Sequence, residues 1–344
     1  MLVDTTLGDL ESAAKDARAA EEAGYAGAFT GEVANDPFLP LVLAADATQR
    51  MNIGTAIAVA FARSPMALAY TAHDLQRVSG GRLMLGLGSQ VRAHVTRRFS
   101  MPWGRPVTQM REFVLAMRAA WASWETGEPL RFEGEHYQHT LMTPTFTPRP
   151  HGHGAPKVLL AGVGDHMTRM AGEVADGFLC HGFTTGRWIR EHTIPALAEG
   201  RRRAGKAMDG FTVKAAVFLA TGTEEETAAA IRRVRSHIAF YASTPAYRPV
   251  LDLHGWGDAA AELTALSKQG RWAEMDSLVS DEMLHEFAIV APPSDVPRLL
   301  AERCAGVDRV SFLASQPGPD VLEAITRVPL PPSAAARLLP ATAR

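Results

Sequence analysis

A short apolar run between glycines constrains the fold of this chain more than any other stretch. Residues 83–87 follow the pair Gly80-Gly81 and run into Gly86-Leu87-Gly88. The run is too short for a helix and apolar throughout, which is typical of a strand buried on both faces of a parallel sheet. Its glycines would let a ligand approach the backbone at the carboxyl end of the strand, where parallel sheets and barrels bind ligands.

The rest of the chain alternates predicted strands and helices around this run. Helix starts are marked by Asp36-Pro37, by Ser64-Pro65 and by a capping box of Thr223 and Glu226. Parallel strands joined by helical crossovers form either a doubly wound sheet or a closed barrel. The number of predicted strands is that of a (β/α)₈ barrel, here one domain over residues 1–315. The strands are expected at 2–6, 25–31, 53–60, 83–88, 157–161, 176–180, 212–220 and 309–314.

Three segments need a separate interpretation. Residues 242–289 contain helical fragments between strand seven and the last helix, and we interpret them as an insertion or lid whose Tyr247, His254 and Trp256 shape a pocket. Residues 316–344 form a C-terminal extension with a proline-rich end that is expected to be loosely held. In the long helix predicted at 105–127, apolar residues recur at spacings of three and four, which fits either a seam between subunits or packing on its own barrel.

Composition argues against several classes of protein. A net charge of -2 with mixed signs gives no reason to expect binding to nucleic acid or to a membrane surface. No apolar run reaches membrane-spanning length, and no basic-then-apolar leader opens the sequence. Cys180 and Cys304 form no C-x-x-C motif, so we expect buried thiols in a cytoplasmic protein. His151-Gly152-His153 comes without carboxylates or thiols, so we expect a loop and no metal site.

Polar residues and glycines follow the predicted strands, at the ends where barrel enzymes carry their active sites. A Rossmann dinucleotide site is not expected, because Val91 and Met167 stand where the third glycine of each glycine pair would belong. The residues after the strands are Gly31 and Glu32, the segment 55–63, Ser89, Gln90, Arg92 and His94, the segment 162–166, and His181 and Phe183.

Residues 1 to about 315 resemble the luciferase-like family of flavin and deazaflavin enzymes. The segments 36–40 and 239–248 are similar to those of a group in that family assigned to coenzyme F420, a 5-deazaflavin hydride carrier. The resemblance implies a (β/α)₈ barrel with insertions, a homodimer and a small-molecule substrate. The motifs that carry it, in the family's order, lie at 19–25, 30–32, 54–57, 79–88, 161–164 and 175–177.

The resemblance also implies where the flat ring of the cofactor would bind. It places a bulge with a non-proline cis peptide in strand three, within one residue of Ala56-Ile57, and the small side chains there leave room for a ring. The glycine pairs would let backbone N–H groups meet the ribityl chain and phosphate, although Asp165 as a helix N-cap would oppose an anion. The expected cofactor-binding residues are Gly31, Thr55, Ala56, Ile57, Ala58, Gly88, Ser89, Gln90, Ala161, Gly162, Val163 and Gly164.

Acid–base chemistry is assigned to Glu32, His94 and His181. Hydride transfer from a carbinol carbon needs a group that takes the hydroxyl proton, and histidine titrates in the right range. Related deazaflavin enzymes carry an acidic residue followed by histidine where this chain has Gly31-Glu32, so that histidine's role is not carried over. Arg63 and the arginines at 92, 97 and 98 could hold an acidic cofactor tail or an anionic substrate.

Three functions remain open from the sequence. The first is an F420-dependent oxidoreductase acting on an alcohol, a carbonyl or an activated double bond. The second is an FMN-dependent monooxygenase on the same barrel, since flavin has a reactive nitrogen where deazaflavin has carbon. The third is a non-catalytic paralogue that binds the cofactor.

Overall fold

The computed structural model describes residues 1–329, so the proline-rich end of the predicted extension, 330–344, lies outside the described residues. In the described part, ten strands join one sheet in the order β11-β10-β12-β1-β2-β3-β5-β8-β9, with β4 beside β5. A further pairing of β10 with β9 closes the order into a (β/α)₈ barrel, as the strand count predicts. The strands of the sheet are β1 (Leu2–Thr6), β2 (Gly27–Thr30), β3 (Asn52–Thr55), β4 (Ala58–Val59), β5 (Leu83–Gly88), β8 (Lys157–Ala161), β9 (Gly177–Cys180), β10 (Thr212–Ala220), β11 (Ala288–Val290) and β12 (Arg309–Leu313).

The chain divides into two compact units. The amino-terminal unit comprises Asp4–Gly162 and Arg169–Leu179, and the carboxyl-terminal unit comprises Met1–Val3, Val163–Thr168 and the described residues from Cys180 onward. A small hairpin of β6 (Phe132–Glu133) and β7 (Gln138–His139) belongs to the amino-terminal unit. The α-helices are α1 (Ala13–Glu22), α2 (Leu39–Ala47), α3 (Pro65–Val78), α4 (Pro106–Thr126), α5 (Asp165–Val174), α6 (Gly186–Trp188), α7 (Ile194–Arg203), α8 (Glu224–Ala242), α9 (Arg248–Leu253), α10 (Gly257–Lys268), α11 (Trp272–Met275), α12 (Asp281–Phe287), α13 (Val296–Arg303) and α14 (Pro319–Thr326).

Two of the three predicted helix starts are confirmed by their capping contacts. Ser64 Oγ accepts a hydrogen bond from Ala67 N at 3.1 Å, and Thr223 and Glu226 form the predicted capping box of α8. Asp36 Oδ1 accepts from Phe38 N at 2.8 Å, but α2 begins only at Leu39. Asp36 Oδ1 also accepts from Leu39 N at 3.2 Å, so this side chain binds the first N–H of α2 although Phe38, not Asp36, occupies the N-cap position.

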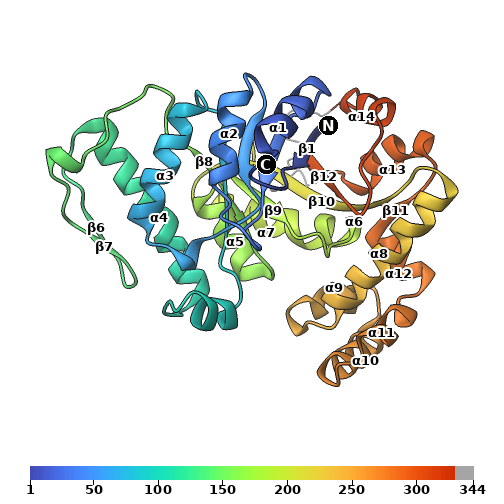
Figure 1. The fold of residues 1–344 in the computed structure, drawn as a ribbon. Helices are drawn as coiled ribbons and strands as arrows, with labels where there is room; N and C mark the ends of the chain where they lie inside the picture. The colour runs from blue at the N-terminus through green and yellow to red at the C-terminus, as the bar shows by residue number, and fades with distance from the viewer. Residues whose placement is uncertain (330–344) are drawn as a thin grey trace. The chain divides into compact units, whose positions relative to one another are not determined.

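The long helix α4 packs on α3 of its own unit (Figure 1). Trp121 Nε1 donates a hydrogen bond to Ala69 O at 3.1 Å, and the ring of Trp124 stacks on Tyr70 with centroids 4.8 Å apart. Gly127 ends α4 in the left-handed region, at a φ of 75°. The apolar stripe of this helix thus serves the intrachain packing that was one of its two interpretations.

Strand three is interrupted, which corrects the single strand predicted at 53–60. β3 pairs with β5 at Ile53 and Leu83, whereas β4 pairs with β5 at Ala58 and Leu87. The stretch from Ile53 to Ala58 is one residue longer than the stretch it faces, so the strand carries a bulge. The predicted non-proline cis peptide bond lies in this bulge, between Ala56 and Ile57.

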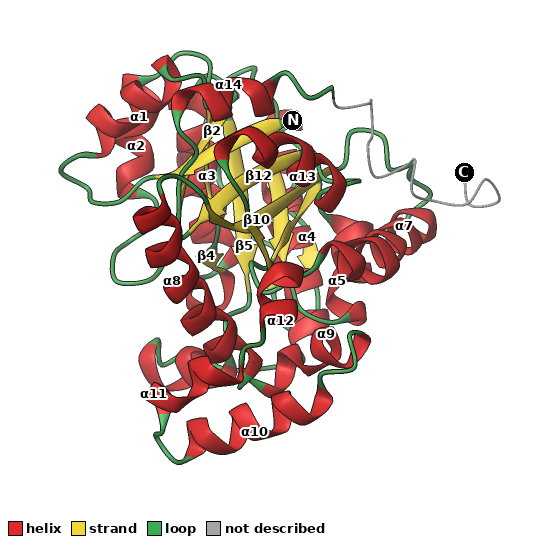
Figure 2. Ribbon diagram, turned by 90° about the vertical axis from the view of Figure 1, so that its right-hand side faces the viewer, coloured by secondary structure: helices red, strands yellow, loops and turns green. Residues whose placement is uncertain are grey.

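The carboxyl-terminal unit has its own aromatic core. Phe183, Phe218 and Phe287 are each about 1% exposed and pack with apolar residues of α8, α10 and α12. The predicted insertion is helical, and Figure 2 shows α10 and α11 beyond the end of α8 and α12 beside it. Its last residues form the short strand β11, which pairs in parallel with the end of β10 and was not predicted.

The two cysteines are free and buried, as predicted. Burial raises the pKa of Cys180 to about 12 and that of Cys304 to about 11. Both thiols are protonated at neutral pH, so neither is suited to nucleophilic catalysis.

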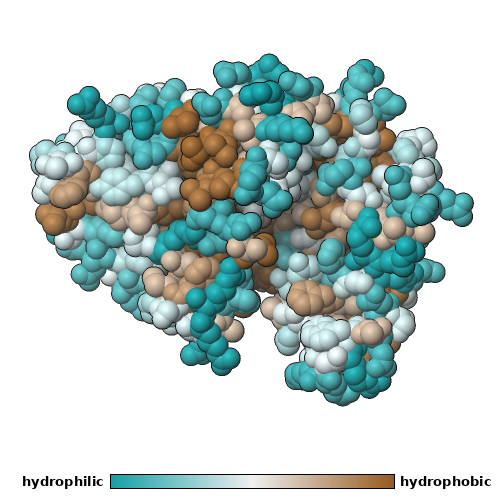
Figure 3. Space-filling view, viewed as in Figure 1, coloured by the Kyte–Doolittle hydropathy of each residue, from teal (hydrophilic) through white to brown (hydrophobic). Residues whose placement is uncertain are grey.

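Exposed apolar side chains gather over α2, where Figure 3 shows a brown patch. Leu39, Val42 and Leu43 are the large exposed apolar residues of this helix. The predicted homodimer stays a prediction.

Among residues 1–329, none of the helices combines the length and the apolar character needed to cross a bilayer.

Gly86 yields a test of the packing between strands. A Cβ at Gly86 would lie 1.9 Å from Thr55 O and 2.7 Å from Leu179 Cδ1, so Gly86→Ala should lower the free energy of unfolding by about 3 kcal/mol. Gly8→Ala is the matched control, because a Cβ there meets no atom within 4 Å. Denaturant unfolding of both variants measures the difference, and equal stabilities would contradict the close approach of β3 and β5.

Candidate active site

Glu32 follows β2 and is held in place by two hydrogen bonds. Its Oε2 accepts from Val59 N at 2.7 Å and from Arg63 Nη1 at 2.6 Å, and its side chain is 7% exposed. The backbone adds two more bonds, from Glu32 N to Ile57 O at 3.0 Å and from Ala56 N to Thr30 O at 2.7 Å. The carboxylate thus fixes the bulge of strand three to the end of β2. Its predicted acid–base role stays a prediction.

The bulge presents a small, partly open surface. Ala56 is exposed and Ile57 half-buried, while Thr55 and Ala58 on either side are buried. Thr55 Oγ1 donates to Gly86 O at 2.6 Å, so this side chain is used within the sheet. A Cβ at Gly88 would lie 3.0 Å from Ile57 Cδ1, so Gly88 lies against the bulge.

Three of the four predicted cofactor segments, Gly31, 55–58 and 88–90, meet in the amino-terminal unit, and the fourth, 161–164, follows β8. A Cβ at Gly31 would lie 3.6 Å from Ala56 O, so Gly31 joins the bulge and Gly88. Ser89 and Gln90 follow in a tight turn, in which Gln90 has a φ of 59° and its Oε1 accepts from Val91 N at 3.0 Å. The bulge and its neighbours therefore form one group, and their contact with a cofactor stays a prediction.

The segment after β8 corrects one expectation. Gly164, not Asp165, occupies the N-cap position of α5, because Gly164 O accepts from Thr168 N at 3.1 Å and Asp165 is the first helical residue. Gly164 has a φ of 83°, which explains the glycine at this position. Glycine has no side chain with which to bind the first N–H groups of the helix. Ala161 and Gly162 are half-buried here, and Val163 is exposed.

His181 follows β9 and pairs with a tyrosine of the helical insertion. His181 Nδ1 accepts from Phe183 N at 3.0 Å, and His181 Nε2 lies 3.2 Å from Tyr247 Oη. The two rings stack with centroids 4.8 Å apart, and Tyr241 meets His181 edge-on at 4.7 Å. The sequence named both residues but not this contact, which joins positions far apart in the chain.

Burial sets the charge of this pair. It lowers the pKa of His181 to about 4 and, with a smaller contribution from Tyr241, raises the pKa of Tyr247 to about 12. Both groups are therefore neutral at pH 7. Because Nδ1 accepts a backbone N–H, the neutral imidazole carries its proton on Nε2 and donates it to Tyr247 Oη. The phenol proton of Tyr247 is then not used in this contact.

The other predicted residues take less central places. His94 is exposed and begins a short π-helix, η2 (His94–Arg98). His254 Nε2 lies 2.9 Å from Thr185 Oγ1, and its ring stacks on Trp256 at 4.6 Å. His254 and Trp256 thus pack the insertion against the start of α6. Within residues 1–329, no group of three His, Cys, Asp or Glu side chains is placed to hold a metal ion.

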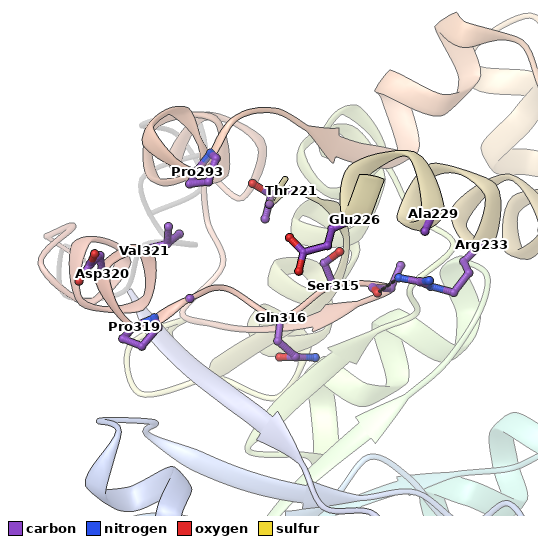
Figure 4. Close-up of a pocket in the computed structure, with 13 residues that line it drawn as sticks. Thr221, Glu226, Ala229, Arg233, Pro293, Ser315, Gln316, Pro319, Asp320 and Val321 are labelled. Atoms are coloured by element: carbon purple, nitrogen blue, oxygen red, sulfur yellow. Dashed lines mark hydrogen bonds between the residues drawn. The ribbon is translucent and has the colours of Figure 1, made fainter. Parts of the chain in front are cut away.

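The carboxyl-terminal unit also has a pocket after β10 and β12, and Figure 4 shows the side chains that line it. Its cavity volume is about 590 Å³. Glu226 serves the capping box of α8, Arg233 Nη2 donates to Ala314 O at 2.8 Å, and Gln316 Nε2 donates to Phe312 O at 3.1 Å. The polar groups of this pocket thus fix the loop after β12, and we assign the pocket no catalytic or binding role.

Replacing Glu32 separates positioning from acid–base work. Glu32→Gln should lower the free energy of unfolding by about 2 kcal/mol, because the amide loses the charge-assisted bond from Arg63. Asp36→Asn is the control, since its contact with Arg63 is longer, 3.5 Å, and more exposed. Denaturant unfolding measures both. Unchanged stability and cofactor affinity with lost turnover would instead support an acid–base role.

His181 predicts a dependence of stability on pH. Its folded pKa, about 4, lies below the unfolded value, so between about pH 6.5 and 4 the unfolded chain binds a proton that the folded chain does not. The free energy of unfolding should therefore decrease as the pH is lowered from about 6.5 to about 4, by up to about 3 kcal/mol from this group. Denaturant unfolding from pH 7 to 4 should show a smaller fall in His181→Phe, whereas the exposed-site control His94→Gln should behave as the parent. Identical profiles for His181→Phe and the parent would refute this.

Comparison with known proteins identifies the family of this chain. A family model described as luciferase-like monooxygenase matches residues 3–309. The uncharacterized protein Rv1360 of Mycobacterium tuberculosis is 52% identical over 303 residues, which cover 88% of this chain and 89% of the relative. The 5,10-methylenetetrahydromethanopterin reductase of Archaeoglobus fulgidus is 26% identical over 293 residues, covering 83% of each chain. The solved coenzyme F420-dependent tetrahydromethanopterin reductase of Methanopyrus kandleri superposes with a TM-score of 0.77 at 21% identity, over 95% of this chain and 97% of that one. This chain belongs to the luciferase-like monooxygenase family.

Proposed function

We propose that this protein is an F420-dependent oxidoreductase that moves a hydride between the deazaflavin ring and a small organic substrate, an alcohol–carbonyl pair or an activated double bond. The neutral, half-buried His181–Tyr247 pair carries the proposal, because hydride transfer at such a substrate needs a partner for one proton. The F420-dependent reductase among its structural relatives supports the choice of cofactor.

The residues present fit a flat ring and an anionic tail. Ala56 and Ile57 offer an open apolar ledge whose backbone is held by Glu32 and β2. Glycine at the N-cap of α5 leaves the positive end of that helix without a capping side chain, which favours a phosphate. When bound, F420 would supply a hydride donor and acceptor at a ring carbon.

The protein's own part in the reaction is the proton. Tyr247 Oη would donate its proton to the carbonyl oxygen of the substrate as that carbon receives the hydride, giving the alcohol. His181 Nε2 would remain hydrogen-bonded to Tyr247 Oη and stabilise the phenolate until a proton from solvent restores it. A phenol with a pKa of about 12 is almost always protonated at neutral pH, so the pair is better suited to reduction than to alcohol oxidation.

An FMN-dependent monooxygenase is the second candidate, because the family model is described by that chemistry. The two candidate reactions require different groups in the site. A monooxygenase must accommodate molecular oxygen at the flavin, whereas the deazaflavin reaction needs a proton donor beside the substrate. Cofactor identity therefore decides between them.

Cofactor titration followed by turnover tests the proposal. Calorimetry and fluorescence should show tight binding of F420 and weak binding of FMN, and reduced F420 should be oxidised by a ketone or an enone from a panel. Tyr247→Phe should keep the cofactor affinity within about twofold and lower kcat at least 100-fold, since it removes only the proton donor. Tyr241→Phe is the matched control in the same aromatic cluster.

Other outcomes would redirect the assignment. Tight binding of FMN without binding of F420 would favour the monooxygenase. Tight binding of F420 without turnover of any acceptor would indicate a non-catalytic paralogue. A Tyr247→Phe enzyme with full kcat would remove Tyr247 as the proton donor.

A further inference from the structure

A cavity between α4 and the loop before β8 lies in the amino-terminal unit, away from the bulge of strand three. Its volume is about 340 Å³, the size of a small ligand site. Gly154 to Pro156, which line it, precede β8 and so lie at the amino end of that strand, whereas the bulge follows the carboxyl end of β3. The cavity is therefore separate from the candidate active site.

Two buried N–H donors line this cavity. Trp124 Nε1 and His151 Nε2 are buried, and neither has a hydrogen-bond partner in the described structure. The Trp124 side chain is 2% exposed. An unpaired buried donor is costly, so both groups are prepared to bind an acceptor.

The proton positions follow from the neighbouring contacts. His153 N donates to His151 Nδ1 at 3.2 Å, so the neutral imidazole of His151 carries its proton on Nε2. Burial, followed by the charges of His73 and His153, lowers the pKa of His151. His151 is therefore a neutral donor rather than a cation at pH 7.

The remaining charges around the cavity disfavour an anionic ligand. Arg118 is already paired, since its Nη2 donates to Asp176 Oδ2 at 2.8 Å and its Nε donates to Val174 O at 3.2 Å. His73 Nε2 lies 3.2 Å from Arg149 O. Glu125 lines the cavity as an exposed carboxylate that would repel a second one.

The walls are aromatic and fixed. Tyr70 stacks on Trp124, His73 meets Trp124 edge-on with centroids 5.4 Å apart, and His151 lies against His73 at 4.4 Å. Trp121 lines the cavity and is anchored to α3 by its hydrogen bond to Ala69 O. A rigid aromatic wall with two unpaired buried donors suits a flat ligand without large ordering of side chains.

We propose that this cavity is a binding site for a small, uncharged aromatic molecule with a carbonyl oxygen, which accepts hydrogen bonds from Trp124 Nε1 and His151 Nε2. The aromatic ring of the ligand packs on the tryptophans. The site does not depend on the cofactor or on turnover.

Benzamide is the probe, because it is flat, uncharged and carries one carbonyl. Two-dimensional nitrogen–proton NMR should show the indole N–H signal of Trp124 moving downfield on titration, with the signal assigned by its loss in Trp124→Phe. The dissociation constant should be at least tenfold lower than that of benzoate, which is charged, and of toluene, which has no acceptor.

Variants locate the effect. Trp124→Phe keeps an aromatic ring but loses the N–H, and it should weaken benzamide binding about tenfold, as should His151→Phe on the loop. Trp272→Phe is the control, because Trp272 is 50% exposed on α11 of the other unit. Folding of each variant is checked by circular dichroism and thermal unfolding.

Any of four results would overturn the proposal. An unmoved Trp124 signal at millimolar benzamide would mean that the donors bind only water. Equal affinity for toluene would show a merely apolar cavity, and equal affinity for benzoate would show an anion site. Binding that survives both variants would place benzamide elsewhere, and none of these results depends on whether the protein uses F420.

Discussion

The carboxylate of Glu32 is the contact on which the candidate site depends most. It joins the end of β2 to the backbone of β4 and to Arg63, across the bulge in strand three. A strand with an extra residue loses regular pairing, so something other than the sheet must fix its position. Here a buried ion pair with a backbone hydrogen bond does so, and Ala56 and Ile57 are left as a defined ledge.

The chain treats its buried ionisable groups in two ways. Glu32 keeps a charged partner, Arg63, and so can be buried as an ion pair. His181 has aromatic neighbours and a backbone donor, and burial removes its charge instead. The difference decides what each group can do: the first positions the backbone, and the second presents a neutral hydrogen-bond donor to a phenol.

Local sequence signals predicted the regular elements well. A continuous apolar run marked β5, the strand predicted at 212–220 matches the bounds of β10, and the capping pattern of Thr223 and Glu226 marked the start of α8. The errors occurred where contacts with residues distant in the chain determine the local structure. β11 forms because a short apolar segment pairs with the end of β10. The sequence indicates Asp165 as the N-cap of α5 because aspartate is a common capping residue, whereas the backbone conformation of Gly164 places the cap one residue earlier.

The sequence by itself determined the barrel, the family and the segments that follow each strand, because burial on both faces and helix caps are local or periodic properties of the chain. It also indicated the bulge at Ala56-Ile57 through resemblance. Only the tertiary structure decided that Glu32 is hydrogen-bonded to Val59 and Arg63, that His181 Nε2 donates a hydrogen bond to Tyr247 Oη, and that Trp124 and His151 line one cavity. These pairings join residues far apart in the chain, and their charge states depend on burial, which no local pattern of residues encodes.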